Sequence, residues 1–208
     1  WRMGYQGLIA GLGNPGRRYA DHRHNFGFDV VQALLEQGDK LGQVQQIKEK
    51  GSFILHGWRP YQDSAWLVVQ PLSYMNRSGE PIAYLARYYD IPLERMLIVH
   101  DELDLDFGKL RFKFDSGLAG HNGLRSIANH LGSKAFYRLR MGIGQPEGSR
   151  QKTADYVLSS FQPEEKRILP HILDEAATGI SLFCCRGPEQ AMNRVHALDR
   201  ESFSENRF

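Results

Sequence analysis

The sequence predicts an α/β fold that forms a single domain, with a mixed β-sheet covered by helices on both faces. Short apolar stretches typical of buried strands alternate along the chain with longer segments whose apolar residues recur at helical spacing. The 208 residues, 41% of them hydrophobic, suffice for one sizeable core. No internal repeat or low-complexity tract divides the chain, so nothing requires a second domain.

Strands are expected where short apolar runs border turn residues. The first, Gly-Leu-Ile-Ala-Gly-Leu, has the composition of a fully buried strand, and Trp66-Leu-Val-Val-Gln70 is equally clear. A later segment, Arg111–Phe114, alternates charged and aromatic side chains, which is typical of a half-exposed strand. We therefore expect strands at residues 7–12, 52–56, 66–70, 96–100, 111–114 and 138–144.

Helices are expected where apolar residues return at the i, i+3, i+4 and i+7 positions. Ser78-Gly-Glu-Pro81 opens such a segment with start signals, and Gly132 closes another. The longest helical pattern is amphipathic and contains the adjacent Cys184 and Cys185. We expect helices at residues 26–35, 78–89, 124–131 and 164–185.

The bulk properties place few limits on function. The formal net charge of +2 is too near neutral to require a polyanionic partner, although basic residues gather in the motif-bearing segments. Neighbouring cysteines make a poor structural disulfide, which favours a reducing, cytoplasmic location. We find neither a signal peptide nor a membrane-spanning run. The expected domain covers residues 7–198, with loose termini at 1–6 and 199–208.

Short motifs at predicted turns and strand ends place asparagines beside histidines and acids, as a rigid scaffold presents functional side chains. They are Gly11-Leu-Gly-Asn14-Pro-Gly16, Arg23-His24-Asn25, Tyr74-Met75-Asn76, His100-Asp101-Glu102-Leu103-Asp104 and Gly120-His121-Asn122-Gly123.

The first motif formally matches the G-x-G-x-x-G dinucleotide fingerprint. No helical pattern follows Gly16, however, so no helix N-terminus would face a pyrophosphate. The acid about twenty residues further on, Glu36, lies inside a predicted helix rather than at a strand end. The glycines fit better as a tight turn that presents Asn14.

His24 is the best candidate for a general base, because imidazole titrates near neutral pH. Asp101, at the end of an apolar strand, can accept its Nδ1 proton and leave Nε2 free to take a proton from water. Taken singly, His22, His100 and His121 are expected to be ordinary surface or core histidines. Together, however, His22-x-His24 and His100-Asp101 resemble a metallohydrolase ligand set, which remains a competing interpretation without a further His or Cys at a confirming spacing.

Water is the expected nucleophile. No serine lies in a nucleophile elbow, and neither cysteine is near a histidine motif. Asn14, Asn76 and Asn122 can donate to a carbonyl or a developing oxyanion and accept from an N–H, without a charge to desolvate. These residues are consistent with hydrolysis of an ester or amide.

Taken in order, the motifs resemble the bacterial-type peptidyl-tRNA hydrolase family, from about Gly7 to about His196. The shared runs include Tyr-Met75-Asn76-x-Ser-Gly, Gly-His-Asn122-Gly-Leu and Arg-Leu-Arg140-x-Gly-Ile-Gly. The resemblance implies a single α/β domain with a twisted mixed β-sheet surrounded by α-helices. It also implies a monomer that hydrolyses the ester between peptide and tRNA, contacts the acceptor stem and the nascent peptide, and needs no cofactor, metal or membrane.

The resemblance also implies roles for individual residues. His24 corresponds to the catalytic base and Asp101 to its orienting partner. The substrate-binding positions are Asn14, Tyr19, Tyr74, Met75, Asn76 and Asn122, with Met75 lining the peptide groove. The basic positions that clamp the terminal phosphate of tRNA are Lys113, Arg140 and Arg111. The role of Asn25 and the mobility of the loop at residues 116–120 stay open.

A binding-only protein is the alternative. Some relatives of the family act as RNA-binding splicing partners in chloroplasts and have lost activity while keeping catalytic-looking residues. Such a protein needs an exposed apolar patch on a helix, and the sequence shows no excess of such residues.

Overall fold

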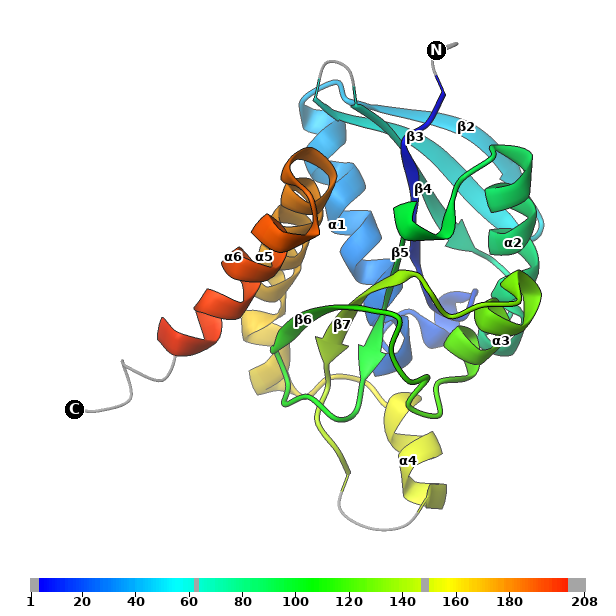
Figure 1. Cartoon of the computed structure of the whole chain (residues 1–208). Coiled ribbons are helices and arrows are strands. Elements are labelled where there is room, and N and C mark those ends of the chain that lie inside the picture. The colour runs from blue at the N-terminus through cyan, green and yellow to red at the C-terminus, as the bar shows by residue number, and fades with distance from the viewer. Residues whose placement is uncertain (1–3, 62–63, 147–149, 202–208) are drawn as a thin grey trace.

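The computed structural model describes residues 4–61, 64–146 and 150–201. It confirms the α/β fold: one seven-stranded mixed sheet has the strand order β2-β3-β4-β1-β5-β7-β6 (Figure 1). Strand β1 runs parallel to β4 and β5, and β5 runs parallel to β7, whereas β2, β3 and β6 are added antiparallel. The strands are β1 Gly7–Gly11, β2 Val44–Lys50, β3 Phe53–Tyr61, β4 Ser64–Pro71, β5 Met96–Glu102, β6 Leu110–Phe114 and β7 Tyr137–Gly142.

Helices cover both faces of the sheet. Because successive strand side chains point to opposite faces, Ile9 packs with α1, α5 and α6, whereas Leu8 and Ala10 pack with α2 and α3. Figure 1 shows these two helical layers on either side of the strands. The helices are α1 Phe26–Lys40, α2 Gly79–Tyr88, α3 Asn122–Leu131, α4 Arg150–Val157, α5 Pro163–Arg186 and α6 Pro188–Glu201. Short 3₁₀ turns are η1 Arg17–Tyr19, η2 Arg23–Asn25, η3 Met75–Arg77 and η4 Leu93–Arg95.

Every strand and helix expected from the sequence is present, but β2, α4 and α6 were not expected. Strand β2 lies at the sheet edge and exposes almost all of its polar residues, so it has no buried face to give an alternating pattern. Strand β5 continues to Glu102, which places Asp101 inside the strand rather than after it. Helix α6 extends to Glu201, past the expected domain boundary at residue 198. At the other end of the chain, just before β1, the Gln6 N–H donates to Ala65 O at 2.8 Å.

Helix α5 is long and apolar enough to cross a membrane by length and composition alone. In the fold it is a core helix, with Ala176 and Ile180 fully buried against the sheet and neighbouring helices. Its apolar composition is therefore largely explained by packing. Cys184 and Cys185 lie on this helix as free cysteines, as predicted.

The turn after β1 is not a dinucleotide site. Gly16 has φ +103°, a conformation that favours glycine, and only the single 3₁₀ turn η1 follows it. A Cβ on Gly13 would lie 2.6 Å from the Phe28 ring, so this glycine serves packing against α1. The prediction of a tight turn that presents Asn14 is confirmed.

Gly27 lets the start of α1 pack directly on the sheet, just after the candidate base. A Cβ there would lie 2.3 Å from Val99 O and 2.4 Å from Leu12 N, both backbone atoms that cannot rotate away. We predict that Gly27→Ala lowers the free energy of unfolding by about 1–3 kcal/mol, measured by urea denaturation. Gly51→Ala, where no atom lies within 4 Å, is the matched control. Equal stability of the two variants would contradict this account.

Candidate active site

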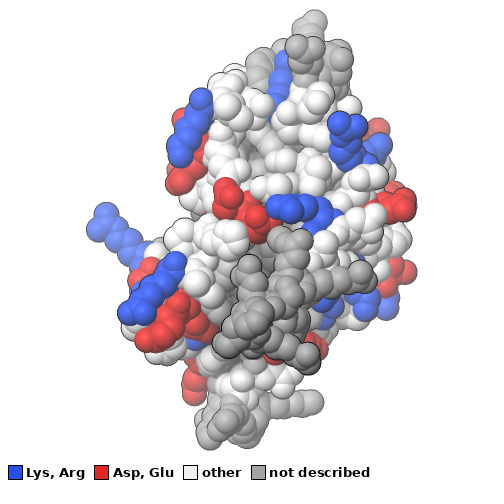
Figure 2. All heavy atoms as spheres, turned by 90° about the vertical axis from the view of Figure 1, so that its left-hand side faces the viewer, with Lys and Arg blue, Asp and Glu red and all other residues white. Residues whose placement is uncertain are grey.

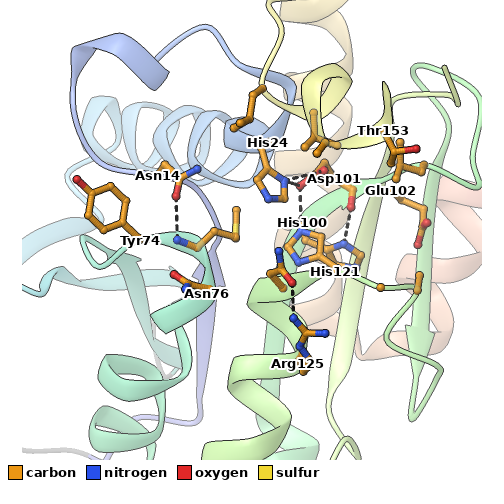
Figure 3. A pocket seen from close by; sticks show the side chains of 18 residues that line it. Asn14, His24, Tyr74, Asn76, His100, Asp101, Glu102, His121, Arg125 and Thr153 are labelled. Carbon is orange, nitrogen blue, oxygen red and sulfur yellow. Dashed lines mark hydrogen bonds and ion pairs between the residues drawn. The ribbon is translucent and has the colours of Figure 1, made fainter. Parts of the chain in front are cut away.

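A cleft of about 1010 Å³ opens where the carboxyl ends of β1 and β5 meet (Figure 3). Ligands of open α/β sheets commonly bind at this edge. Figure 3 shows Asn14, Tyr74 and Asn76 on one side of the cleft and Glu102 and Thr153 on the other, with three histidines between them. The cleft is lined by Asn14, His24, Tyr74, Met75, Asn76, His100, Asp101, Glu102, Leu103, Ala119, Gly120, His121, Asn122, Arg125, Thr153, Ala154, Val157 and Leu158.

His24 and Asp101 form the predicted pair. The His24 Nδ1–H donates to Asp101 Oδ1 at 2.8 Å and to Oδ2 at 3.0 Å, and both side chains are almost fully buried. Burial alone would lower the pKa of His24, but the Asp101 charge and hydrogen bond raise it above its ordinary value. Likewise, burial would raise the pKa of Asp101, but His24 and His121 hold it well below its usual range. The carboxylate is thus ionised, and His24 Nε2 is the ring nitrogen left to accept a proton.

His121 belongs to this network, which the sequence analysis missed. Its Nε2 lies 3.0 Å from Asp101 Oδ1, and its ring centroid is 4.9 Å from that of His24. His100 lies behind it, with Nδ1–H donating to Asp101 O at 2.7 Å, and burial lowers the pKa of His100 to about 3. The feature of the sequence that could have identified His121 is its position directly before Asn122, where it caps the N-terminus of α3.

The metallohydrolase set predicted as an alternative is not brought together. His100 bonds its neighbour's backbone carbonyl, and His22 does not line the cleft. His24, Asp101 and His121 do place ligand atoms within 4.8 Å of one another. Both imidazoles, however, direct N–H groups at the carboxylate, whereas a metal ligand must present a lone pair. These residues fit a hydrogen-bonded network better than a metal site.

Asn14 is held in one orientation by backbone groups. Its Oδ1 accepts from Met75 N at 2.8 Å, so its Nδ2 amide remains as a donor. The Asn25 side chain fixes the turn that contains Asn14. Its Oδ1 accepts from Asn14 N, and its Nδ2 donates to Asn14 O. Asn25 is buried, and these two hydrogen bonds hold the backbone of Asn14 in place.

The remaining expected substrate contacts differ in how they reach the cleft. Tyr74 is 52% exposed and lines it together with Met75 and Asn76. Tyr19 is not among the lining residues, but its ring packs edge-to-face on Tyr74 at 6.4 Å between centroids. Tyr19 therefore supports Tyr74 from outside the cleft.

Asn122 begins α3 and lies exposed on the cleft, paired with a residue that the sequence analysis did not select. Arg125 Nη2 donates to Asn122 Oδ1 at 2.6 Å, which turns the Asn122 amide N–H₂ away from this contact. Arg125 also lines the cleft. Its spacing of three residues along the helix was the signal that could have identified it.

The expected phosphate-binding residues share one face of β6 and β7. Arg111 is directly opposite Arg140, and Lys113 is opposite Arg138, so Lys113 and Arg140 are diagonal neighbours. Arg140 Nε donates to Glu102 Oε2 at 2.8 Å, which links this basic face to the cleft wall. Figure 2 shows Lys and Arg interspersed with Asp and Glu on the side of α5 and α6. Among the residues drawn in colour, that side has no basic cluster comparable to the face of β6 and β7.

Buried Arg138 anchors the loop whose mobility was left open. Its Nη1 donates to Ser116 Oγ at 2.6 Å and to Gly117 O. Ala119, in the same loop, has φ +47° and lines the cleft. The loop at residues 116–120 is thus tied to β7 at its start.

Helix α4 and the residue after it form a wall of the cleft that the sequence analysis did not predict, through Val157 and Leu158. Arg23, the residue before His24, contacts the C-terminal end of α4 and the segment that follows it. The Arg23 guanidinium donates to Ser159 Oγ at 2.8 Å, pairs with Glu165 at 2.6 Å and lies 4.4 Å from the Tyr156 ring centroid. The wall and the base are therefore fixed to the same short segment.

Comparisons with known proteins show the family of this chain. The family model for peptidyl-tRNA hydrolase matches residues 8–204. The chain is 42% identical over 201 residues to the peptidyl-tRNA hydrolase of Oleidesulfovibrio alaskensis, covering 95% of this chain and 99% of the relative. It is 45% identical over 191 residues to that of Mycobacterium ulcerans, covering 91% and 97%. A crystal structure of peptidyl-tRNA hydrolase from Acinetobacter baumannii matches with a TM-score of 0.83 and 35% identity, over 94% of this chain and 96% of that one. The chain therefore belongs to the peptidyl-tRNA hydrolase family.

Proposed function

We propose that this chain hydrolyses the ester bond between peptide and tRNA in peptidyl-tRNA by letting His24, held by Asp101, activate a water molecule. The observation that carries the proposal is the buried hydrogen-bonded pair at the floor of the cleft, with His24 Nδ1 occupied and Nε2 left to accept. An imidazole held in this way can act as a general base, because its free Nε2 lone pair points in a fixed direction.

The reaction follows from this geometry. His24 Nε2 takes a proton from water as the oxygen attacks the ester carbonyl, and Asp101 stabilises the imidazolium that forms. The same nitrogen then returns the proton to the departing ribose oxygen. The products are a free peptide carboxylate and a tRNA that can be charged again.

Asparagine amides stabilise the oxyanion that forms in the attack. Because Met75 N occupies the Asn14 Oδ1, the Asn14 Nδ2 is the group that can donate to the developing charge. The Asn122 amide, oriented by Arg125, supplies a further donor in the cleft. Neither donor carries a charge that would have to be desolvated.

Selectivity for peptidyl over aminoacyl esters arises from asparagine amides that line the cleft. Asn76 and Asn122 can pair with the N–H and C=O of a peptide bond. A free protonated amine would leave them poorly paired, which costs roughly 1–3 kcal/mol.

The basic face of β6 and β7 binds a tRNA phosphate. Lys113 is exposed and adds a positive charge beside Arg111 and Arg140. Lys113→Ala should weaken tRNA binding and reduce the slope of log K against log salt by about 0.7–0.9, the value for one lost phosphate contact. Affinity measured over a series of salt concentrations tests this prediction.

The matched control is Lys134→Ala, an exposed lysine outside this face. Its slope should stay at the wild-type value. A Lys113 variant with an unchanged slope would remove this residue from the phosphate site.

Release of labelled peptide from an N-blocked aminoacyl-tRNA in EDTA tests the function itself. We expect turnover that survives the chelator. Loss of turnover in EDTA, restored by a metal, would contradict water activation by the pair alone. Tight tRNA binding without hydrolysis would identify the binding-only alternative.

We further propose that the chain acts in the cytoplasm as a monomer, without a membrane. The free cysteines of α5 support a reducing compartment.

A further inference from the structure

His121 makes hydrogen bonds in two directions at once. Its Nδ1 accepts from the backbone N–H groups of Gly123 at 3.1 Å and Leu124 at 3.3 Å, which makes it the N-cap of α3. Its Nε2 lies 3.0 Å from Asp101 Oδ1. The ring is 8% exposed, so water does not compete freely for either nitrogen.

These contacts fix the tautomer of His121. A neutral imidazole has one donor and one acceptor nitrogen, and the two backbone N–H groups require Nδ1 to be the acceptor. The ring proton is therefore on Nε2, where it points at Asp101. In Figure 3 the His121 ring lies beside the His24–Asp101 pair, with a dashed line to the carboxylate.

The charges around His24 are few among the described residues. Strand β5 contributes Asp101 and the neutral His100, and the segment before α3 contributes His121. Helix α3 contributes Arg125, whose guanidinium donates to Asn122. On η2 itself, the Arg23 guanidinium turns away to Glu165. Helix α4 contributes Thr153, Ala154 and Val157 to the cleft, and Leu158 follows the helix; none of these residues is titratable.

Farther along β5, Glu102 also lines the cleft, but Arg140 neutralises it at 2.8 Å. Asp101 is thus the charge that most directly governs the protonation of His24. Any group that donates a hydrogen bond to Asp101 reduces the negative charge felt by His24.

We propose that His121 is a positioning residue that, as the neutral Nε2–H tautomer fixed by α3, aims Asp101 at His24 and limits how strongly Asp101 stabilises the imidazolium. This inference rests on the proposed function, in which His24 must be unprotonated to accept a proton from water. Helix α3, which fixes the tautomer of His121, thereby helps to set the pH range in which His24 is unprotonated.

Two substitutions separate the cap from the donor. In His121→Asn, the side-chain oxygen can take the place of Nδ1 and cap α3, but nothing donates to Asp101. In His121→Gln, the longer side chain places an amide N–H₂ near the former Nε2 and can donate to Asp101, but the cap is lost. The measurements are the pH profile of kcat/KM on an N-blocked aminoacyl-tRNA, an NMR titration of the His24 ring and thermal unfolding of each full-length variant.

We expect His121→Asn to unfold near the wild-type temperature while its acid limb and the His24 titration move up by about one pH unit. His121→Gln should be less stable but titrate as the wild type does. A wild-type titration in His121→Asn, or equal shifts in both variants, would overturn the proposal. If the wild type failed to hydrolyse the ester, the proposed function would be lost, yet the NMR titrations would still decide the role of His121.

Discussion

Replacing His24 by alanine should lower kcat by about 10²–10⁴-fold, because the variant has no base to take the proton from water. The side chain is almost fully buried and contacts Asp101, so its loss leaves space in the cleft rather than a new clash. The measurement is steady-state release of peptide from an N-blocked aminoacyl-tRNA. Near-normal turnover would remove His24 from the mechanism.

Two controls make this result specific to catalysis. Circular dichroism and thermal unfolding should stay close to the wild type, and tRNA affinity should change little, because the basic face of β6 and β7 is untouched. Replacing His22, which does not line the cleft, provides a matched histidine two residues away. We expect His22→Ala to retain most of the wild-type turnover, whereas His24→Ala should lose it.

Replacing Asp101 by asparagine should lower kcat by about 10²–10⁴-fold while keeping the shape of the side chain. An amide has one acceptor oxygen, whereas Asp101 accepts from His24 through both oxygens and from His121 through one. The amide N–H₂ would also face imidazole N–H groups, so the His24 ring would turn or change tautomer. Without the negative charge, the pKa of His24 should fall, because burial then acts unopposed.

Glu102→Gln is the matched control for this substitution. Glu102 is the next residue on β5, is equally buried and pairs with Arg140 rather than with a histidine. We expect it to alter the salt dependence of tRNA binding much more than kcat. Equal losses of kcat in both variants would mean that Asp101 has no special relation to the base.

Much of the candidate site could be predicted from the sequence, because many of its residues lie at turns and strand ends. Asn14 lies in the turn after β1, His24 lies in a turn before α1, and Asp101 is near the end of β5. The carboxyl ends of adjacent parallel strands meet at one edge, so the pairing of β1 with β5 brings Asn14 and Asp101 together.

What the sequence could not show depends on contacts between distant segments. The role of His121 beside the base depends on its 3.0 Å contact with Asp101, and that of Arg23 on contacts with residues 136 or more positions away. Helix α4 has no apolar stripe and acquires its place by docking beside the segment that carries His24. The diagonal relation of Lys113 to Arg140 follows from strand register, which neither strand specifies alone.

The most direct test of His24 as the base compares two titrations of the wild type. One is the pH profile of kcat/KM in EDTA, and the other is an NMR titration of the His24 ring. A protonated His24 cannot accept a proton, so activity should rise with pH through the His24 pKa, which Asp101 raises above 6.5 despite burial. We predict that the acid limb and the ring titration coincide. An acid limb that occurs at a different pH from the ring titration, or no acid limb at all, would contradict the assignment of His24 as the base.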